Sequence, residues 1–314
     1  MKRKIYVMSI FIIVMALIIG SYALLNKNEK ESLESSKIDV IATLFPQYDF
    51  VKQIGKDKVN VTLLLPPAVE SHVYEPKPSD IIKISNSDMF VYTGKDMEPW
   101  ADTIAESIDN INIIDVSENI QLSKEEHEHE EEEEHEEEHE YDPHIWLNPD
   151  NAKIMIDNIV EGLSKLDPDY SDFYKQNAEE YKEKINKLDT DIQEVVDNAK
   201  RNKLVFGGRF AFAYFIEKYN LEYIGAYNSC STETEPSVAV IANVIQEVKN
   251  NNIPVIFYEE FSAHAVADSI ASQTGAKTLL FHSVHNVTKD DLENEVTYVD
   301  VMRQNLDNLK IALN

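Results

Sequence analysis

The sequence predicts an α/β protein with two lobes, each a mostly parallel sheet flanked by helices, joined by a long rigid helix. Short runs of β-branched and aromatic residues alternate with helical segments, and this alternation occurs in two separate series. Residues 169–202, between the two series, form a charged stretch that contains neither Gly nor Pro. These observations predict the two lobes and the helix that links them.

The first series defines an N-terminal lobe over residues 38–168, and the second a C-terminal lobe over residues 203–314. The strands expected in the first series are Ile38–Leu44, Val59–Leu64, Met89–Thr93 and Ile111–Asp115, with helices at Tyr48–Gly55, Pro78–Ser85 and Pro99–Ile108. The strands expected in the second are Lys203–Phe206, Glu222–Gly225, Pro254–Tyr258 and Lys277–Phe281, with helices at Ala211–Tyr219, Ser237–Asn250 and Ala263–Thr274. Strands that alternate with helices favour parallel pairing, because the crossover helices cover both faces of the sheet.

The linking stretch, residues 169–202, repeats apolar side chains at helical spacing. These side chains are Tyr181, Ile185, Leu188, Ile192 and Val195. A single helix of this length would reach about 50 Å at 1.5 Å per residue, which is longer than one small lobe. The alternative is a pair of ordinary helices with a turn near Leu188-Asp189.

The amino terminus is a targeting segment. Lys2, Arg3 and Lys4 precede an uncharged run from Ile5 to Leu25, which is long enough to span a bilayer. Residues 1–25 are therefore either a signal peptide cleaved after Ala23 or an uncleaved membrane anchor, and residues 26–37 are a polar linker. Both alternatives place the body of the protein outside the cytoplasmic membrane, because the basic flank stays inside.

Composition excludes several classes of function. The chain has 57 acidic and 29 basic residues, a formal charge of −28, so nucleic acids and anionic membrane surfaces would repel it. It has one cysteine, Cys230, which rules out an internal disulfide and a thiolate metal cluster. The sequence contains neither G-x-G-x-x-G after a strand nor G-x-x-x-x-G-K-[ST], the glycine-rich motifs that bind phosphates. Nucleotide binding therefore has no support.

The segment Lys124–Tyr141 combines twelve glutamates with His127, His129, His135 and His139. Such a density of like charge prevents a packed core, so we expect a solvated loop. Imidazoles among carboxylates suit divalent transition metals, and the alternative is a loop that only aids solubility. A loop of this kind would bind metals loosely and in several ways, which makes it an auxiliary site.

Three further histidines are candidates for a main metal site. His72 follows the Val59–Leu64 strand, His144 lies in Asp142–Pro149, and His282 directly follows the Lys277–Phe281 strand. Ligands of open α/β sheets bind beyond the carboxyl ends of the strands, where two of these histidines are expected. We therefore expect His72, His144 and His282 to converge on a metal ion.

Four motifs resemble the solute-binding proteins of zinc and manganese ABC transporters, the cluster A-I metal-binding family. They are Leu44–Phe50, Glu70–Asp80, Asp142–Pro149 and Thr234–Ser237, and the resemblance covers almost all of residues 38–314. It implies two α/β lobes joined by a rigid helix, with one metal ion in the cleft. It also implies that His72 and His144 hold the first two ligand positions, and that the acidic loop is the insertion typical of zinc-type members.

The second half departs from this family pattern. The family's third ligand position falls on Arg209, whose guanidinium has only donors and cannot bind a cation. The fourth falls nearest to His282. The remaining ligand is then Glu260, His285, Glu235 or a water molecule. Of these candidates, the predicted site includes Glu260 and His285.

The function expected from these features is passive capture of Zn²⁺, in preference to Mn²⁺, and delivery to an ABC permease by a monomeric protein. Ligation rich in nitrogen favours zinc, whereas manganese prefers more carboxylate oxygen. A zinc-dependent hydrolase is an alternative, because three histidines leave room for a metal-bound water, although no H-E-x-x-H motif occurs. A surface adhesin is the other alternative. We expect no enzymatic activity.

Overall fold

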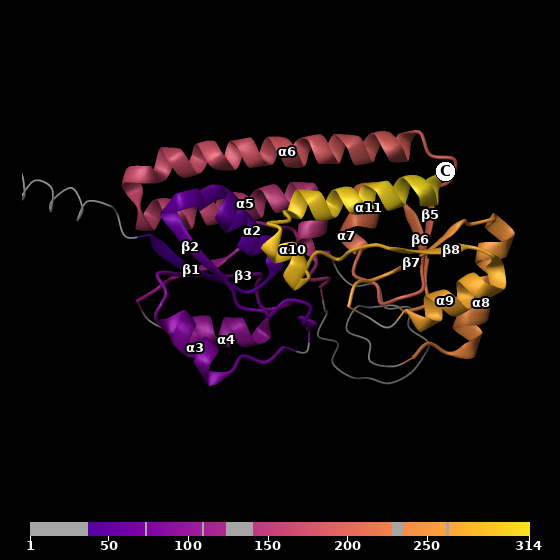
Figure 1. The fold of residues 1–314 in the computed structure, drawn as a ribbon, viewed down its shortest axis with the longest axis horizontal. Helices are drawn as coiled ribbons and strands as arrows, with labels where there is room; N and C mark the ends of the chain where they lie inside the picture. Colours follow the sequence, from indigo (N-terminus) through magenta and orange to yellow (C-terminus); the bar gives the residue numbers. More distant parts are fainter. Residues whose placement is uncertain (1–36, 73, 109, 124–140, 228–234, 262–263) are drawn as a thin grey trace, which may run out of the picture. The chain divides into compact units, whose positions relative to one another are not determined.

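Two four-stranded parallel sheets organise the computed structural model (Figure 1). It describes residues 37–72, 74–108, 110–123, 141–227, 235–261 and 264–314. The predicted signal or anchor segment, the four loop histidines and Cys230 lie outside these residues. None of the described helices combines the length and apolar character needed to cross a membrane.

The first sheet has the strand order β2-β1-β3-β4. Its strands are β1 (Ile38–Ala42), β2 (Val59–Leu63), β3 (Met89–Tyr92) and β4 (Asn112–Asp115). Successive side chains of a strand point to opposite faces. Val40 and Met89 accordingly belong to one buried cluster, and Ile41 and Phe90 to another. Both faces of this sheet are therefore buried.

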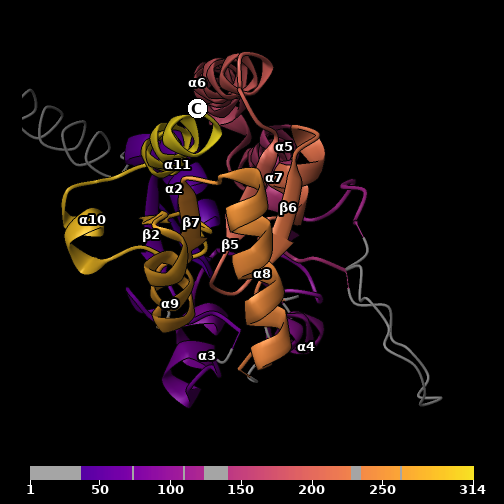
Figure 2. The same ribbon diagram turned by 90° about the vertical axis from the view of Figure 1, so that its right-hand side faces the viewer.

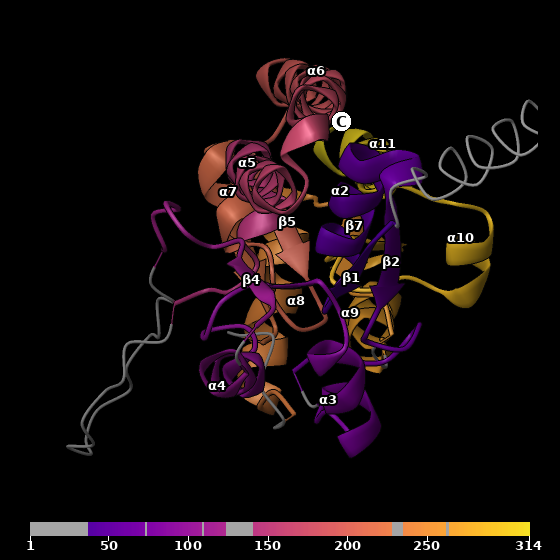
Figure 3. The ribbon, with the colours of Figure 1, turned by 90° about the vertical axis from the view of Figure 1, so that its left-hand side faces the viewer.

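Two pairs of helices cover the faces of the first sheet. The first pair is α2 (Phe45–Gly55) and α5 (Pro149–Leu166), and the second is α3 (Pro78–Ser85) and α4 (Pro99–Ser107). Figure 3 shows α3 and α4 on the side of the lobe away from α5. Prolines at the first helical positions of α3, α4 and α5 fix where these helices begin.

The second sheet repeats the same arrangement in the order β6-β5-β7-β8. Its strands are β5 (Lys203–Phe206), β6 (Glu222–Gly225), β7 (Val255–Tyr258) and β8 (Lys277–Leu280). The helices of this lobe are α7 (Ala213–Lys218), α8 (Val238–Asn251) and α9 (Ala265–Thr274). The predicted fold class of two parallel-sheet lobes is confirmed.

Helix α6 (Ser171–Asp197) is a single helix of 27 residues. Its buried side chains recur every three or four residues: Tyr174, Ala178, Tyr181, Ile185, Leu188 and Ile192. This face packs against α2, α5 and α11, and Figures 1 and 2 show α6 running alongside both lobes. The prediction of one long helix is confirmed, at about 40 Å. The alternative turn near Leu188-Asp189 is absent from this described helix.

The C-terminal part of the chain contains two helices that the sequence patterns did not identify, α10 (Lys289–Glu293) and α11 (Tyr298–Leu313). Three short 3₁₀ helices complete the described elements: η1 (Lys56–Lys58), η2 (Ile145–Leu147) and η3 (Pro168–Tyr170).

Between β8 and α10 the chain returns to the N-terminal lobe. The Phe45 amide donates to the His285 carbonyl at 3.0 Å, and the Ala68 amide donates to the Val287 carbonyl, also at 3.0 Å. Residues 38–314 form one compact unit, and its largest hydrophobic cluster contains residues of both lobes. Part of the range predicted as the C-terminal lobe is thus hydrogen-bonded to the N-terminal one.

Candidate metal centre

Three imidazoles gather between the two sheets. The ring centroids of His72 and His144 are 5.3 Å apart, and those of His72 and His285 are 6.5 Å apart. His72 lies in the loop after β2, His144 precedes η2, and His285 lies in the segment between β8 and α10. The structure therefore brings together two of the predicted histidines and the alternative candidate His285.

The short helix η2 and the capped start of α5 fix the position of His144. The short helix η2 follows it directly, and α5 then begins at Pro149, where the side chain of Asn148 accepts the Asp150 amide at 2.9 Å. The Asp142 carboxylate oxygen Oδ1 lies 2.8 Å from both the backbone nitrogen and Nδ1 of His144. Because an ionised carboxylate only accepts hydrogen bonds, Nδ1 carries the ring proton, and the lone pair is on Nε2.

An equivalent chain of hydrogen bonds orients His285. The Ser283 hydroxyl donates to Glu260 Oε1 at 2.6 Å, so it is the acceptor in its contact with His285 Nδ1. The ring proton of His285 is therefore also on Nδ1. Nε2 of His285 and Nε2 of His72 are buried and make no hydrogen bond within the described part of the chain. Both nitrogens can offer a lone pair to a cation.

His282, which the sequence predicts beside His72 and His144, lies in a different environment from theirs. Its Nδ1 accepts the Val284 amide at 2.9 Å and lies 3.2 Å from Glu260 Oε1. Its backbone amide donates to Asn305 on α11 at 2.7 Å. These contacts hold His282 beside Glu260.

A tight turn after His282 explains why the positions differ. Val284 has a φ of 70°, a left-handed conformation that is unusual for a β-branched residue. Asn286 then donates to the carbonyls of Pro66 and Val69, both at 2.8 Å, so the segment is fastened to the loop before His72. This turn directs His285 toward His72. Strained backbone of this kind occurs often at functional sites.

Glu260, the other candidate ligand, lies beside the imidazoles of His282 and His285. Oε2 accepts the Ser283 amide at 2.8 Å, and Oε1 lies 3.4 Å from His285 Nδ1. Glu260 thus approaches His285 at Nδ1. The other alternative, Glu235, accepts the hydroxyl of Tyr227 at 2.9 Å.

Two imidazoles of the centre, those of His72 and His285, are held neutral. Burial, followed by the neighbouring His144, His285 and Arg209, lowers the pKa of His72 to about 2. Burial also lowers the pKa of His285, although Glu260 and Glu70 act in the opposite direction. Metal ligation requires deprotonated imidazoles, so these histidines can bind a cation at neutral pH.

Two carboxyl groups and one arginine lie beside the histidines. Glu259, directly after β7, is buried, and burial together with Glu260 and Glu70 raises its pKa well above the usual range. Nη1 of Arg209 lies 3.8 Å from Glu70 Oε2, while Glu70 Oε1 lies 4.0 Å from His285 Nε2. The sequence patterns did not identify Glu259, although two adjacent glutamates at the end of a buried strand were a usable signal.

The approach of β5 to β7 and α9 depends on Gly207. A Cβ atom there would lie 2.6 Å from the Cα of Ala267 on α9, which is too close for any side chain. The close packing leaves Arg209 at the carboxyl end of the sheet, near Glu259. Within the described residues, no group of three or more His, Cys, Asp or Glu side chains is arranged to hold a metal ion.

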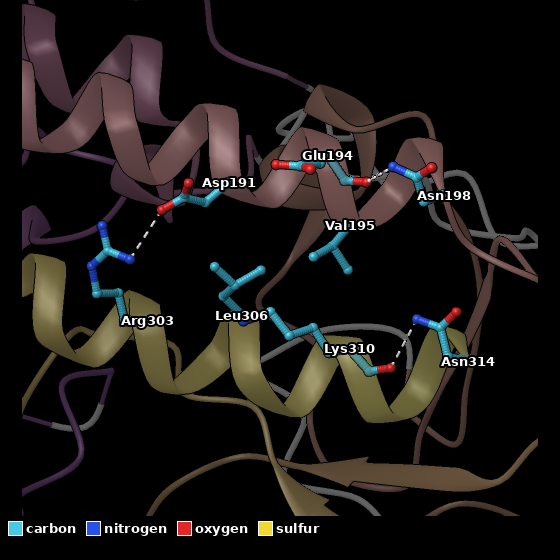
Figure 4. A pocket seen from close by; sticks show the side chains of 8 residues that line it. All are labelled: Asp191, Glu194, Val195, Asn198, Arg303, Leu306, Lys310 and Asn314. Atoms are coloured by element: carbon cyan, nitrogen blue, oxygen red, sulfur yellow. Dashed lines mark hydrogen bonds and ion pairs between the residues drawn. The ribbon is translucent and has the colours of Figure 1, made fainter.

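A groove between α6 and α11 has no comparable chemistry (Figure 4). Its charged pair, Arg303 and Asp191, is linked at 3.1 Å. The side chain of Asn198 donates to the Glu194 carbonyl, and that of Asn314 to the Lys310 carbonyl. The groove contains no histidine, so the centre between the sheets is the stronger candidate.

Two parallel-sheet lobes, a long helix beside both, and buried histidines between the sheets define a two-lobed solute-binding protein. Residues 40–312 match the family described as zinc-uptake complex component A, periplasmic, and the chain belongs to this family. The family consists of solute-binding proteins.

Known relatives agree with this assignment. The high-affinity zinc uptake system protein ZnuA of Bacillus subtilis is 38% identical over 295 residues, covering 92% of each chain. The zinc-binding lipoprotein AdcA of Streptococcus pneumoniae is 31% identical, and the match covers 90% of this chain but 57% of AdcA. The crystal structure of the Zn(II)-bound ZnuA-like domain of S. pneumoniae AdcA superimposes with a TM-score of 0.75 at 30% identity, covering 88% of this chain and 99% of that domain.

Proposed function

We propose that this protein captures Zn²⁺ outside the cytoplasmic membrane and delivers it to an ABC permease. The observation that carries the proposal is the group of buried imidazoles formed by His72, His144 and His285, two of which have Nδ1 fixed by hydrogen bonds. Family membership and the zinc-binding relatives support it.

Zinc fits this centre better than manganese. Three imidazole nitrogens supply most of the ligands, and nitrogen-rich sites favour zinc, copper and nickel over manganese. The buried position of the rings also provides neutral ligands without a proton being displaced. The loop histidines His127, His129, His135 and His139 would form weaker auxiliary sites.

The remaining features of the proposal concern location and assembly. Residues 1–25 either anchor the protein in the membrane or are removed after Ala23, and the protein acts as a monomer. It binds zinc without transforming a substrate. Neither the comparisons nor the described site favours the hydrolase or the adhesin.

Zinc titration of chelator-stripped protein tests the proposal. We expect one tight equivalent at about pH 7.5, measured by competition with a chelating dye. His285→Ala should weaken this equivalent by at least a hundredfold, because it removes a direct ligand. His282→Ala is the matched variant three residues away, and it should weaken binding less than tenfold.

Two outcomes would contradict the proposal. Wild-type protein that takes up no tight equivalent of zinc would rule out zinc capture. A tight equivalent lost in His282→Ala and retained in His285→Ala would rule out the ligand set. Circular dichroism of each variant distinguishes loss of ligation from loss of folding.

A further inference from the structure

We infer that Glu70 supplies the fourth, oxygen ligand of the zinc site, and that Arg209 competes with zinc for this carboxylate. The inference rests on the proposed zinc capture. It adds Glu70 as a ligand and Arg209 as a residue that promotes zinc release. Its starting point is the Glu70 side chain, which lies between the histidines and the guanidinium.

The Glu70 carboxylate lies close to a nitrogen of the centre that could bind zinc. Its Oε1 is 4.0 Å from Nε2 of His285. With zinc–ligand distances of about 2.0–2.1 Å in tetrahedral geometry, two ligand atoms lie about 3.3–3.4 Å apart. A movement of less than about 1 Å would therefore bring Glu70 and His285 to the spacing of two ligands. His285 Nε2 is buried and lacks a hydrogen-bond partner among the described residues, so it is available on the side that faces Glu70.

The backbone already holds Glu70 close to the centre. Glu70 is two residues before His72, and its Oε1 is 3.3 Å from the backbone nitrogen of His72, which donates to it. One short segment thus presents an imidazole and a carboxylate together. Its side chain is only 19% exposed, so its charge needs a partner when zinc is absent.

Arg209 is that partner, and it comes from the opposite lobe. Its Nη1 is 3.8 Å from Glu70 Oε2, and it lies after β5, whereas Glu70 lies after β2. A guanidinium has no lone pair to offer a metal ion. It can only neutralise the carboxylate or be repelled by the cation, so Arg209 and zinc compete for the same negative charge.

If Arg209 and zinc compete for Glu70, the direction in which an Arg209 substitution changes zinc affinity can be predicted. Replacing Arg209 by a neutral residue leaves Glu70 available and removes a positive charge beside the ion. Zinc should then bind more tightly and dissociate more slowly. A purely structural role for Arg209 would have the opposite effect, since its loss would loosen the site.

The test measures zinc affinity and dissociation rate in chelator-stripped full-length variants. Arg209→Gln should raise the affinity at least tenfold and slow dissociation, whereas Arg209→Lys, which keeps the charge, should stay within threefold of wild type. Arg303→Gln is the matched control, because it removes one arginine from the groove of Figure 4, where Arg303 pairs with Asp191. It should leave the affinity unchanged.

Carboxylate variants test the ligand itself. Glu70→Gln should weaken the tight equivalent at least tenfold, and in this background Arg209→Gln should gain less than threefold. Glu259→Gln tests the other buried carboxyl group beside the centre, and if Glu70 is the ligand it should weaken the tight equivalent less than Glu70→Gln does.

Separate results distinguish the inference from the function on which it rests. If wild-type protein binds zinc tightly but Arg209→Gln binds it equally or more weakly, the competition is refuted and zinc capture stands. If Glu259→Gln abolishes the tight equivalent and Glu70→Gln retains it, the fourth ligand is Glu259. Absence of tight binding by wild type would refute the proposed function instead.

Discussion

Hydrogen bonds at Nδ1 fix the tautomers of the buried histidines. His144 and His285 each donate from Nδ1 to a fixed acceptor, so their lone pairs are on Nε2. In His282 the arrangement is reversed, because Nδ1 accepts the Val284 amide. Removing an acceptor that orients a ligating imidazole typically lowers metal affinity 10–100-fold.

Glu98 is a second residue with an unusual environment, at the carboxyl edge of the first sheet. It is buried, and its Oε2 accepts the Thr93 amide at 2.8 Å. Burial raises its pKa to about 7, although hydrogen bonds with Thr43 and Thr93 act in the opposite direction. The folded protein therefore binds a proton at Glu98 that the unfolded chain has lost near neutral pH.

We predict that Glu98 makes the protein less stable as pH rises from 5 to 8. A raised pKa stabilises the folded state below the unfolded value of 4.5, and this contribution is lost as pH rises through about 7. The loss is about 2–3 kcal/mol over this range. Glu98→Gln should abolish it, so the variant should be more stable than wild type at pH 8 and similar at pH 5, in urea unfolding followed by circular dichroism.

An equal pH dependence in Glu98→Gln and wild type would show that Glu98 titrates normally. Asp102→Asn is a suitable control, because this half-buried carboxylate accepts the Tyr92 hydroxyl and lies in the first turn of the neighbouring α4.

Among the elements, α6 shows the strongest relation between pattern and structure. Its buried face repeats every three or four residues, and it contacts α5 on the N-terminal side and α11 on the C-terminal side. The Asp49 carboxylate of α2 connects the same elements, since its Oδ2 accepts the Tyr298 amide at 2.9 Å and the Tyr181 hydroxyl at 2.5 Å. The helix therefore supports both sheets without contributing a ligand.

We predict that Leu188→Ala lowers the free energy of unfolding by about 2–5 kcal/mol, the usual cost of truncating a fully buried leucine. Zinc affinity of the folded variant should stay within threefold, because α6 supplies none of the proposed ligands. Lys187→Ala, at the adjacent exposed position, should change stability by less than about 0.5 kcal/mol. Equal effects of the two substitutions in chemical unfolding would contradict the assignment of the buried face.

Helical periodicity predicted α6, and short runs of β-branched and aromatic residues predicted the eight strands. The sequence of α11 also carries helix signals, because Thr297 and Asp300 form a capping box before an amphipathic run. No comparable sequence signal indicates whether His282 or His285 lies beside His72. Which of the two lies there depends on the left-handed turn at Val284, a residue type that gives no warning of positive φ.

At the scale of the whole molecule, the histidines of the centre are all attached to the N-terminal lobe. His72 and His144 belong to it, and the His285 backbone carbonyl accepts the Phe45 amide. The C-terminal lobe contributes Arg209 and Glu259 from the ends of β5 and β7. Zinc would thus be held by one lobe, and its affinity would be adjusted by charged and neutral groups of the other.

The central claim is that the tight zinc site lies between the lobes and is independent of the acidic segment Lys124–Tyr141. The sequence predicts a solvated loop there, and ordering such a loop around an ion costs about 1–2 kcal/mol per residue. The cleft histidines lie on hydrogen-bonded backbone and avoid this cost.

Calorimetric titration of a variant lacking Lys124–Tyr141, beside His144→Ala in the full-length protein, tests this claim most directly. Deletion of the segment should remove the weak equivalents and leave the tight one within a few-fold of wild type. His144→Ala should abolish the tight equivalent and leave the weak ones. The opposite result, a tight equivalent that disappears with the segment and survives His144→Ala, would contradict the account.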